Sequence, residues 1–162
     1  MAATGKWVGL FLSILCFWTC IKINSSKYQQ VEIEILSEPS GEPSRIFTDD
    51  QIAEYDGTDD SKPLLMAVRG VVFDVSKGKE FYGKGSGYHM LAGKDCTRAI
   101  AMWSLEKKDC THNLDGLSDD TLKSLDEVYL GTYKKKYPIV GYMDYLLEKY
   151  ADKFQDRFKE DL

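Results

Sequence analysis

The sequence predicts one small domain of mixed α and β structure, preceded by an apolar leader and followed by a helical tail. Two apolar runs, Leu64–Val68 and Val71–Val75, flank the pair Arg69-Gly70, which is a pattern typical of a β-hairpin. Segments with helical periodicity lie on both sides of this hairpin. The length of 162 residues suits a single core with appendages rather than two full domains.

The amino terminus has the features of a secretory signal peptide. Lys6 precedes an apolar run from Trp7 to Ile23, and a polar stretch follows it. The uninterrupted part of this run is shorter than the roughly 20 residues that cross a bilayer comfortably. We therefore expect residues 1–26 to be a cleaved signal peptide, with an uncleaved signal anchor as the alternative. The first outcome predicts a secreted or lumenal protein, and the second predicts anchoring in the membrane of the endoplasmic reticulum.

The segment between the leader and the domain is interpreted as a linker over residues 27–44. Valine and isoleucine alternate with glutamate at its start, which predicts an edge strand or an extended chain. Prolines and a glycine at 39–44 then mark a domain boundary. The domain itself is expected over 45–142. It opens with a capping box from Thr48 to Gln51, which predicts a short helix ending at Asp56-Gly57.

A glycine-rich stretch follows the hairpin. Four glycines fall between Phe81 and Asp95, and Tyr82 and Tyr88 lie among them. Glycine lets the backbone reach positive φ and approach a ligand closely. The stretch is therefore interpreted either as a long turn or as a ligand clamp, and its spacing alone favours the turn.

The second half of the domain reads as mostly helical. Apolar residues recur at helical spacing after Lys94 and again after Ser118, which can cap a helix. We expect, in chain order, a helix over 94–103, an irregular polar stretch over 104–115, a long helix over 118–136, a short strand within 137–141, and helix from 142 onward through the tail, assigned as residues 143–162.

Charge and motif content exclude several classes of function. The net charge is −5 with a pI near 5.1, so nucleic acid is not an expected partner. The glycines complete neither a P-loop nor a dinucleotide-binding fingerprint, and the chain has no G-x-S-x-G, H-E-x-x-H or EF-hand motif. We therefore expect no enzymatic activity.

Two cysteines, Cys96 and Cys110, remain once the leader is set aside. In an oxidising compartment they could form a disulfide that closes a short loop. Cys96 also lies in an apolar helical stretch, where a buried free thiol is equally expected. Neither cysteine has metal-site spacing.

A set of short motifs carries a resemblance to a known family. They occur in this order: Phe47-Thr48, Tyr55-Asp56-Gly57, Leu65-Met66-Ala67-Val68, Val72-Phe73-Asp74-Val75, Phe81-Tyr82-Gly83, Tyr88, Ala92-Gly93-Lys94-Asp95, Thr97-Arg98 and Lys136-Tyr137. Together they resemble the cytochrome b5-like haem/steroid-binding domain of the membrane-associated progesterone receptor family. Residues 109–112 and 125–142 are most similar to the neudesin branch of that family.

The resemblance implies an α+β, cytochrome b5-like haem/steroid-binding fold, in which a small sheet and helices form a ligand pocket. It also implies ferric haem with the tyrosinate of Tyr88 as axial ligand, and a steroid as a further ligand. Tyr82, Lys136 and Tyr137 would line the site. A phenolate is an anionic oxygen donor that suits ferric iron.

Two features of the sequence bear on the assignment of the iron ligand. The chain has two histidines, His89 and His112, which would allow bis-histidine ligation, but it lacks the His-Pro-Gly-Gly motif of true cytochrome b5 domains. Gly87 stands where relatives commonly have proline before the ligand tyrosine, so the loop should be less preorganised.

The function implied by the resemblance is that of a secreted or lumenal haem-binding protein, a neurotrophic-type extracellular signalling factor with a cell-surface receptor. One alternative is a membrane-anchored haem/steroid-binding protein of the endoplasmic reticulum that assists haem-dependent monooxygenases. Another is an interaction domain that has lost haem. An exposed porphyrin face would also allow a haem-mediated homodimer.

Overall fold

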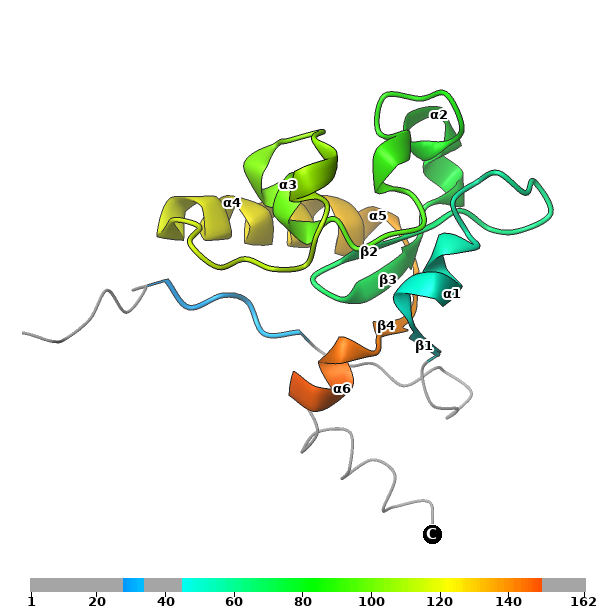
Figure 1. Cartoon of the computed structure of the whole chain (residues 1–162). Coiled ribbons are helices and arrows are strands. Elements are labelled where there is room, and N and C mark those ends of the chain that lie inside the picture. The colour runs from blue at the N-terminus through cyan, green and yellow to red at the C-terminus, as the bar shows by residue number, and fades with distance from the viewer. Residues whose placement is uncertain (1–27, 34–44, 150–162) are drawn as a thin grey trace, which may run out of the picture.

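The computed structural model describes residues 28–33 and 45–149, and the leader, residues 34–44 and residues 150–162 lie outside the described part (Figure 1). Among the described residues, no helix is both long and apolar enough to cross a membrane. The elements are, in chain order, β1 (Ile46–Phe47), α1 (Asp49–Ala53), β2 (Leu65–Val68), β3 (Val71–Asp74), η1 (Ser76–Gly78), α2 (Lys79–Tyr82), η2 (His89–Leu91), α3 (Thr97–Met102), η3 (Lys107–Asp109), α4 (Asp119–Val128), η4 (Tyr129–Tyr133), α5 (Lys134–Lys136), β4 (Ile139–Met143) and α6 (Tyr145–Lys149).

A four-stranded mixed sheet in the order β1-β4-β3-β2 forms the centre of the domain. The predicted hairpin is confirmed as the antiparallel pair of β2 and β3, in which Val68 lies opposite Val71. Arg69 and Gly70 have φ angles of 58° and 77°, which is the left-handed pair required by a type I′ turn. Strand β4 pairs antiparallel with β3 and parallel with β1, so the two ends of the domain meet in one sheet.

Successive strand residues point to opposite sides of the sheet, and a buried cluster covers each side. Met66, Val68 and Phe73 belong to a large cluster with α3, α4 and η4. Leu65, Ala67 and Val72 belong to a smaller cluster with Phe47 of β1, Ile52 of α1 and Met143 of β4. The helices that contribute to the large cluster also form the walls of the site described below.

Helix α1 begins as predicted and ends early. The N–H of Gln51 donates to the Thr48 hydroxyl at 3.2 Å, and the N–H of Thr48 donates to the Gln51 side chain at 3.0 Å, which confirms the capping box. The helix ends at Ala53 rather than at Asp56-Gly57. The Asp56 carboxylate accepts the N–H of Thr58 at 2.8 Å, so a local turn competes with the last helical turn.

Helix α3 begins at Thr97, three residues after the predicted start at Lys94. The preceding residues extend the sheet instead of the helix. Gly93 donates its N–H to the Leu65 carbonyl at 2.7 Å, and the Lys94 carbonyl accepts the N–H of Ala67 at 2.9 Å. Hydrogen bonding to the open edge of β2 therefore decides where the helix can begin.

The predicted long helix is present but contains a π-helical turn. Helix α4 runs from the Ser118 cap to Val128, η4 is the π-helical turn, and α5 continues to Lys136. The N–H of Lys134 donates to the Tyr129 carbonyl, which is the i→i+5 pattern of a π-helix. Tyr129 and Tyr133, the first and last residues of this turn, are buried, whereas α5 after it is exposed.

The predicted short strand is confirmed as β4, but it extends further than expected. Tyr142 is fully buried within it and pairs with Val71, so the tail helix begins at Tyr145 rather than at Tyr142. Leu146 of α6 is 1% exposed in the large cluster. The first turn of the tail is therefore part of the core.

The described part of the predicted linker, Tyr28–Ile33, runs along α4 and is called here the docked segment (Figure 1). The Val31 N–H donates to Oδ2 of Asp126 at 2.7 Å, and the Tyr28 hydroxyl donates to the same oxygen at 2.9 Å. Arg69 forms an ion pair with the other carboxylate oxygen of Asp126 and donates to the Val31 carbonyl. Ile33 is 2% exposed, so this segment contributes to the core.

Of the two states left open for Cys96 and Cys110, the structure shows the disulfide, with the two Cα atoms 4.0 Å apart. The bond closes a loop that contains α3, the Trp103–Leu105 segment after it and η3. This loop provides one wall of the candidate site.

Candidate ligand-binding site

A cavity of about 320 Å³ opens between the glycine loop, α3 with the residues after it, and the α4–η4 helix. Its walls are largely apolar and include Leu91 of η2, Ile100 of α3 and Val128 of α4. The volume lies at the lower end of the roughly 300–1,000 Å³ typical of small-molecule sites. A ligand larger than the cavity would therefore remain partly exposed at its mouth.

Tyr82 and Tyr88, the two tyrosines of the glycine loop, both line this cavity. Their rings lie 6.3 Å apart, with Tyr82 7% exposed at the end of α2 and Tyr88 47% exposed at the rim. The glycine loop is thus both a turn and a wall of the cavity. Of the sequence-predicted residues, these two are brought together in the cavity wall.

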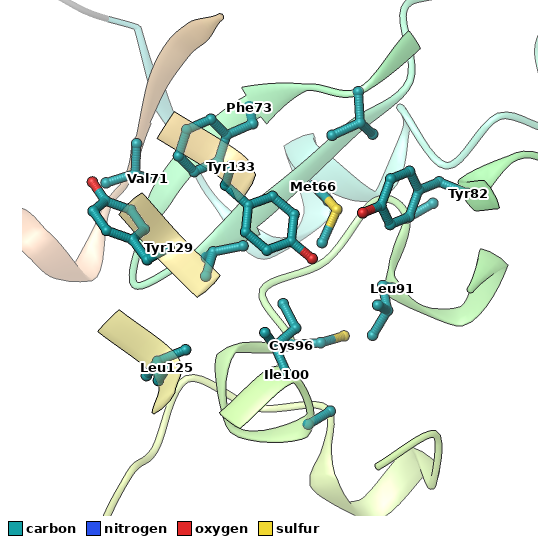
Figure 2. Packing of buried hydrophobic residues seen from close by; sticks show 14 of the residues in the cluster. Met66, Val71, Phe73, Tyr82, Leu91, Cys96, Ile100, Leu125, Tyr129 and Tyr133 are labelled. Atoms are coloured by element: carbon teal, nitrogen blue, oxygen red, sulfur yellow. The ribbon is translucent and has the colours of Figure 1, made fainter. Parts of the chain in front are cut away.

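A third tyrosine, Tyr133 of η4, also lines the cavity. Figure 2 shows its hydroxyl and that of Tyr82 pointing toward each other, with Leu91 and Ile100 nearby. Burial raises the pKa of Tyr133 well above that of a free phenol, and the neighbouring Tyr82 raises it further. The Tyr133 hydroxyl therefore stays protonated and is able to donate a hydrogen bond to a polar atom in an otherwise apolar pocket.

Tyr133 belongs to the long helix expected over 118–136 and was not among the site residues predicted from the sequence. Its helical spacing with Leu125 and Tyr129 indicated burial, and the structure confirms that. Only the packing of η4 against the glycine loop reveals that the buried face continues into the cavity.

The other two predicted site residues lie outside the cavity wall. The ring of Tyr137 lies 6.2 Å from that of Tyr82, so it supports the site from behind, and burial raises its pKa. Lys136 is exposed on α5, which follows the π-helical turn. The structure thus places Tyr137 beside Tyr82, whereas Lys136 is exposed to solvent.

Neither histidine lines the cavity. Nδ1 of His89 lies 3.2 Å from the backbone carbonyl of Tyr82, so this ring braces the loop from outside. His112 is exposed and stacks on Tyr145 of α6, with ring centroids 4.1 Å apart. Bis-histidine ligation thus has no support in this geometry.

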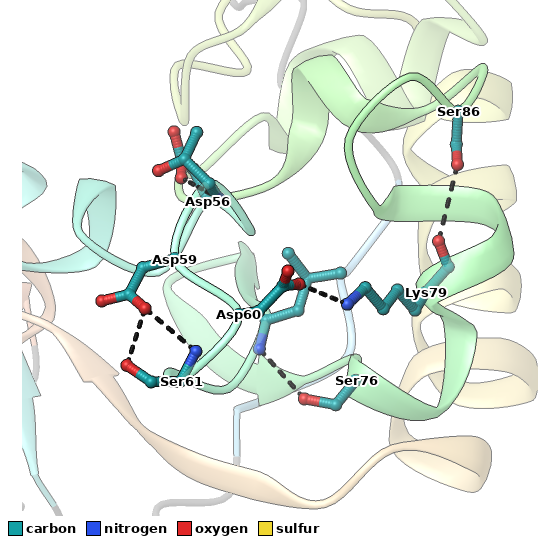
Figure 3. A network of polar contacts seen from close by, with 9 residues as sticks. Asp56, Asp59, Asp60, Ser61, Ser76, Lys79 and Ser86 are labelled. Carbon is teal, nitrogen blue, oxygen red and sulfur yellow. Dashed lines mark hydrogen bonds and ion pairs between the residues drawn. The ribbon is translucent and has the colours of Figure 1, made fainter.

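Hydrogen bonds to α2 determine the path of the glycine loop. The Lys79 carbonyl accepts the N–H of Gly83 at 2.8 Å, and the Tyr88 N–H donates to the Phe81 carbonyl at 3.1 Å. The same Lys79 carbonyl accepts the Ser86 hydroxyl at 3.5 Å (Figure 3). The Lys79 ammonium also contacts Asp60 at 2.6 Å, but this exposed ion pair contributes little to stability. Together the backbone bonds present Tyr88 beside Tyr82.

Alanine substitutions at two glycines of the loop, Gly85 and Gly87, should change the stability of the protein in opposite directions. Gly85 has a φ of +85°, so Gly85→Ala should lower the free energy of unfolding by about 1–2 kcal/mol. Gly87 lies outside the positive-φ region, and a Cβ there meets no atom within 4 Å. Gly87→Ala should therefore raise this free energy by about 0.4–1 kcal/mol, since it restricts the unfolded chain. Urea unfolding of both variants tests this, and destabilisation by Gly87→Ala would contradict it.

Comparison with known proteins agrees with the fold. The family model described as the cytochrome b5-like heme/steroid-binding domain matches residues 48–144. A solved Arabidopsis thaliana structure described as having a cytochrome b5 like fold is 41% identical, with a TM-score of 0.56, and the match covers 62% of this chain and 91% of that one.

Curated relatives match over the same region. "Probable steroid-binding protein 3" of Arabidopsis thaliana is 43% identical over 95 residues, which cover 59% of this chain and 94% of that protein. "Membrane steroid-binding protein 2" of the same plant is 38% identical over 119 residues, covering 67% of this chain and 51% of that protein. The "Neuferricin homolog" of Caenorhabditis elegans is 35% identical over 130 residues, covering 80% of this chain and 40% of that protein.

This chain thus spans about half or less of the length of the two longer relatives. The resemblance recognised in the sequence is confirmed at the level of the family and the fold. The chain belongs to the cytochrome b5-like heme/steroid-binding domain family, in the group that includes the membrane steroid-binding proteins and the neuferricin homologues.

Proposed function

We propose that this chain binds ferric haem in the cavity, with the phenolate of Tyr88 as the axial ligand. The observation that carries the proposal is the position of Tyr88, half-exposed on the rim of an apolar cavity and backed by the buried ring of Tyr82. Haem needs apolar walls for its porphyrin and a donor atom for its iron, and tyrosine oxygen is an established donor. The residues present fit both requirements.

Other side chains of the cavity have supporting roles in this proposal. Tyr82 packs against both Tyr88 and Tyr137, so it orients the ligand tyrosine and stiffens the loop. The protonated hydroxyl of Tyr133 provides a hydrogen-bond donor at the cavity floor. Lys136 remains a prediction from the family resemblance, because its side chain is exposed outside the cavity wall.

The spectrum of the haem complex tests the ligand assignment. Purified protein mixed with haemin should give a tyrosinate-type absorption spectrum, and Tyr88→Phe should lose it and bind haemin at least about tenfold more weakly, because a charged donor to the metal is removed. Tyr55→Phe is the matched control, since Tyr55 is a partly exposed tyrosine that does not line the cavity. An unchanged spectrum for Tyr88→Phe would refute the assignment.

Steroid binding is a second candidate, favoured by the tyrosine hydroxyls at the apolar cavity floor. A rigid apolar molecule with one polar oxygen would bury its body against Leu91, Ile100 and Val128 and accept a hydrogen bond from Tyr133. Competition between progesterone and haemin separates the two proposals. Displacement of haemin by progesterone supports a shared pocket, and progesterone binding unaffected by Tyr133→Phe contradicts this assignment.

We also propose that the protein acts in the secretory system as a binding protein rather than an enzyme, either secreted or lumenal. The apolar leader supports this route, and the names of the membrane steroid-binding relatives agree with a membrane association. Extracellular signalling through a receptor follows from the resemblance to neudesin. Amino-terminal sequencing of the protein from eukaryotic cells tests the route. A mature chain that retains Met1 would support the membrane-anchored alternative.

A further inference from the structure

Trp103 occupies a backbone position that normally belongs to glycine. Its φ and ψ of 54° and 35° are left-handed, and it directly follows the last residue of α3. The N–H of Ser104 donates to the Ala99 carbonyl, and the N–H of Trp103 donates to the Ile100 carbonyl. These are the two bonds of a Schellman motif, in which glycine is the usual residue at this site. A left-handed residue with a Cβ costs roughly 1–2 kcal/mol.

Packing in the free protein does not offset this cost. The Trp103 side chain is 75% exposed, more than any other exposed large hydrophobic residue among those the structure describes. On one side it lines the mouth of the cavity of the candidate site. On the other side it lines a more open hollow between α3 and the start of α4. A large and mostly exposed aromatic side chain thus lies at the entrance of an apolar cavity.

The backbone around Trp103 is firmly held, so its side chain is the part free to move. The disulfide closes the loop around it. The Ser104 hydroxyl donates to the Asp109 carboxylate at 2.6 Å and accepts the N–H of Glu106 at 3.1 Å. Rotation of the indole about its own side-chain bonds is therefore the simplest way to cover or open the cavity.

We infer that Trp103 is a ligand-covering residue, whose indole packs on the face of a flat apolar ligand that protrudes from the cavity. The inference rests on the proposed function, because it takes haem as the ligand. A cavity of about 320 Å³ leaves such a ligand partly exposed, and an indole at the mouth removes part of that surface from water. The retained strain at the helix end then has a functional reason.

Hydroxyl-radical footprinting of the full chain, read by mass spectrometry, measures the cover directly. Addition of haemin should reduce modification of Trp103 several-fold. Phe81 is an internal control, because it is 52% exposed and does not line the cavity. Modification of Phe81 should stay constant.

Two substitutions separate ligand covering from a structural role. Trp103→Gly removes the indole and suits the left-handed backbone, so the unfolding midpoint of the ligand-free protein should stay constant or rise. Transfer of haem from this variant to excess apomyoglobin should nevertheless be roughly threefold to tenfold faster than from wild type, the range expected for loss of one aromatic contact. Trp103→Phe should recover most of the slow transfer.

The outcomes distinguish this inference from the proposed function. Absence of any haem spectrum in the wild-type chain would overturn the proposed function and this inference with it. A normal spectrum with Trp103 still fully modified, or with equal transfer rates for wild type and Trp103→Gly, would overturn the covering role alone. Protection of Trp103 together with faster transfer from a stable Trp103→Gly variant establishes it.

Discussion

Asp126→Asn is expected to lower the free energy of unfolding by about 3–5 kcal/mol, because it leaves the buried guanidinium of Arg69 without its counter-charge. The side chains of Arg69 and Asp126 are only 6% and 3% exposed. The same carboxylate also accepts hydrogen bonds from the docked segment, through the Val31 N–H and the Tyr28 hydroxyl. One substitution therefore weakens the hairpin turn, α4 and the docked segment together.

Urea denaturation of Asp126→Asn beside the matched control Glu127→Gln measures this effect. Glu127 is the next residue of α4 and is exposed, so its neutralisation should change stability by less than about 0.5 kcal/mol. In the double variant Arg69→Met/Asp126→Leu no charge remains buried, and much of the lost stability should return. Equal stability of Asp126→Asn and Glu127→Gln would show that this ion pair does not hold the segment in solution.

The double variant Cys96→Ser/Cys110→Ser is expected to lose about 3 kcal/mol of stability, the value for a disulfide that closes a loop of about 15 residues. The cysteines are separated by 14 positions, and the loop between them carries Ile100, Trp103 and Leu105 of the cavity wall. Haem retention should fall with stability, since the wall loses its covalent closure.

Thermal unfolding and haem transfer to apomyoglobin measure the two losses. Treatment of the wild type with a thiol reductant should reproduce both losses. A stable double serine variant that loses haem as slowly as the wild type would show that the bond is dispensable for the cavity.

Features that depend on near neighbours in the chain were predictable. The β2–β3 hairpin follows from two apolar runs around a two-residue turn, and the start of α1 follows from the capping box of Thr48 and Gln51. Ser118 likewise caps α4, as predicted. In each of these cases the groups that form the hydrogen bonds lie within a few residues of one another.

Element boundaries that depend on distant partners were predicted wrongly. Helix α3 starts late because residues 93–95 pair with β2, and α6 starts late because Tyr142 completes the sheet beside β3. The π-helical turn at η4 was not predicted, because a count of apolar periodicity does not resolve one extra residue in a single turn. Tyr133 at the end of this turn lines the cavity, and α5 after it is exposed.

By itself, the sequence determined the family, the hairpin, the helix caps and the glycine loop with its two tyrosines, because these are written in contiguous motifs. Tertiary structure decided which distant groups meet. It joined Arg69 in a turn to Asp126 on a helix, closed the disulfide, and brought Tyr133 and Trp103 to the cavity. The physical reason is that charge pairing, disulfide bonding and cavity lining depend on positions in space, which follow only after the sheet and helices have packed.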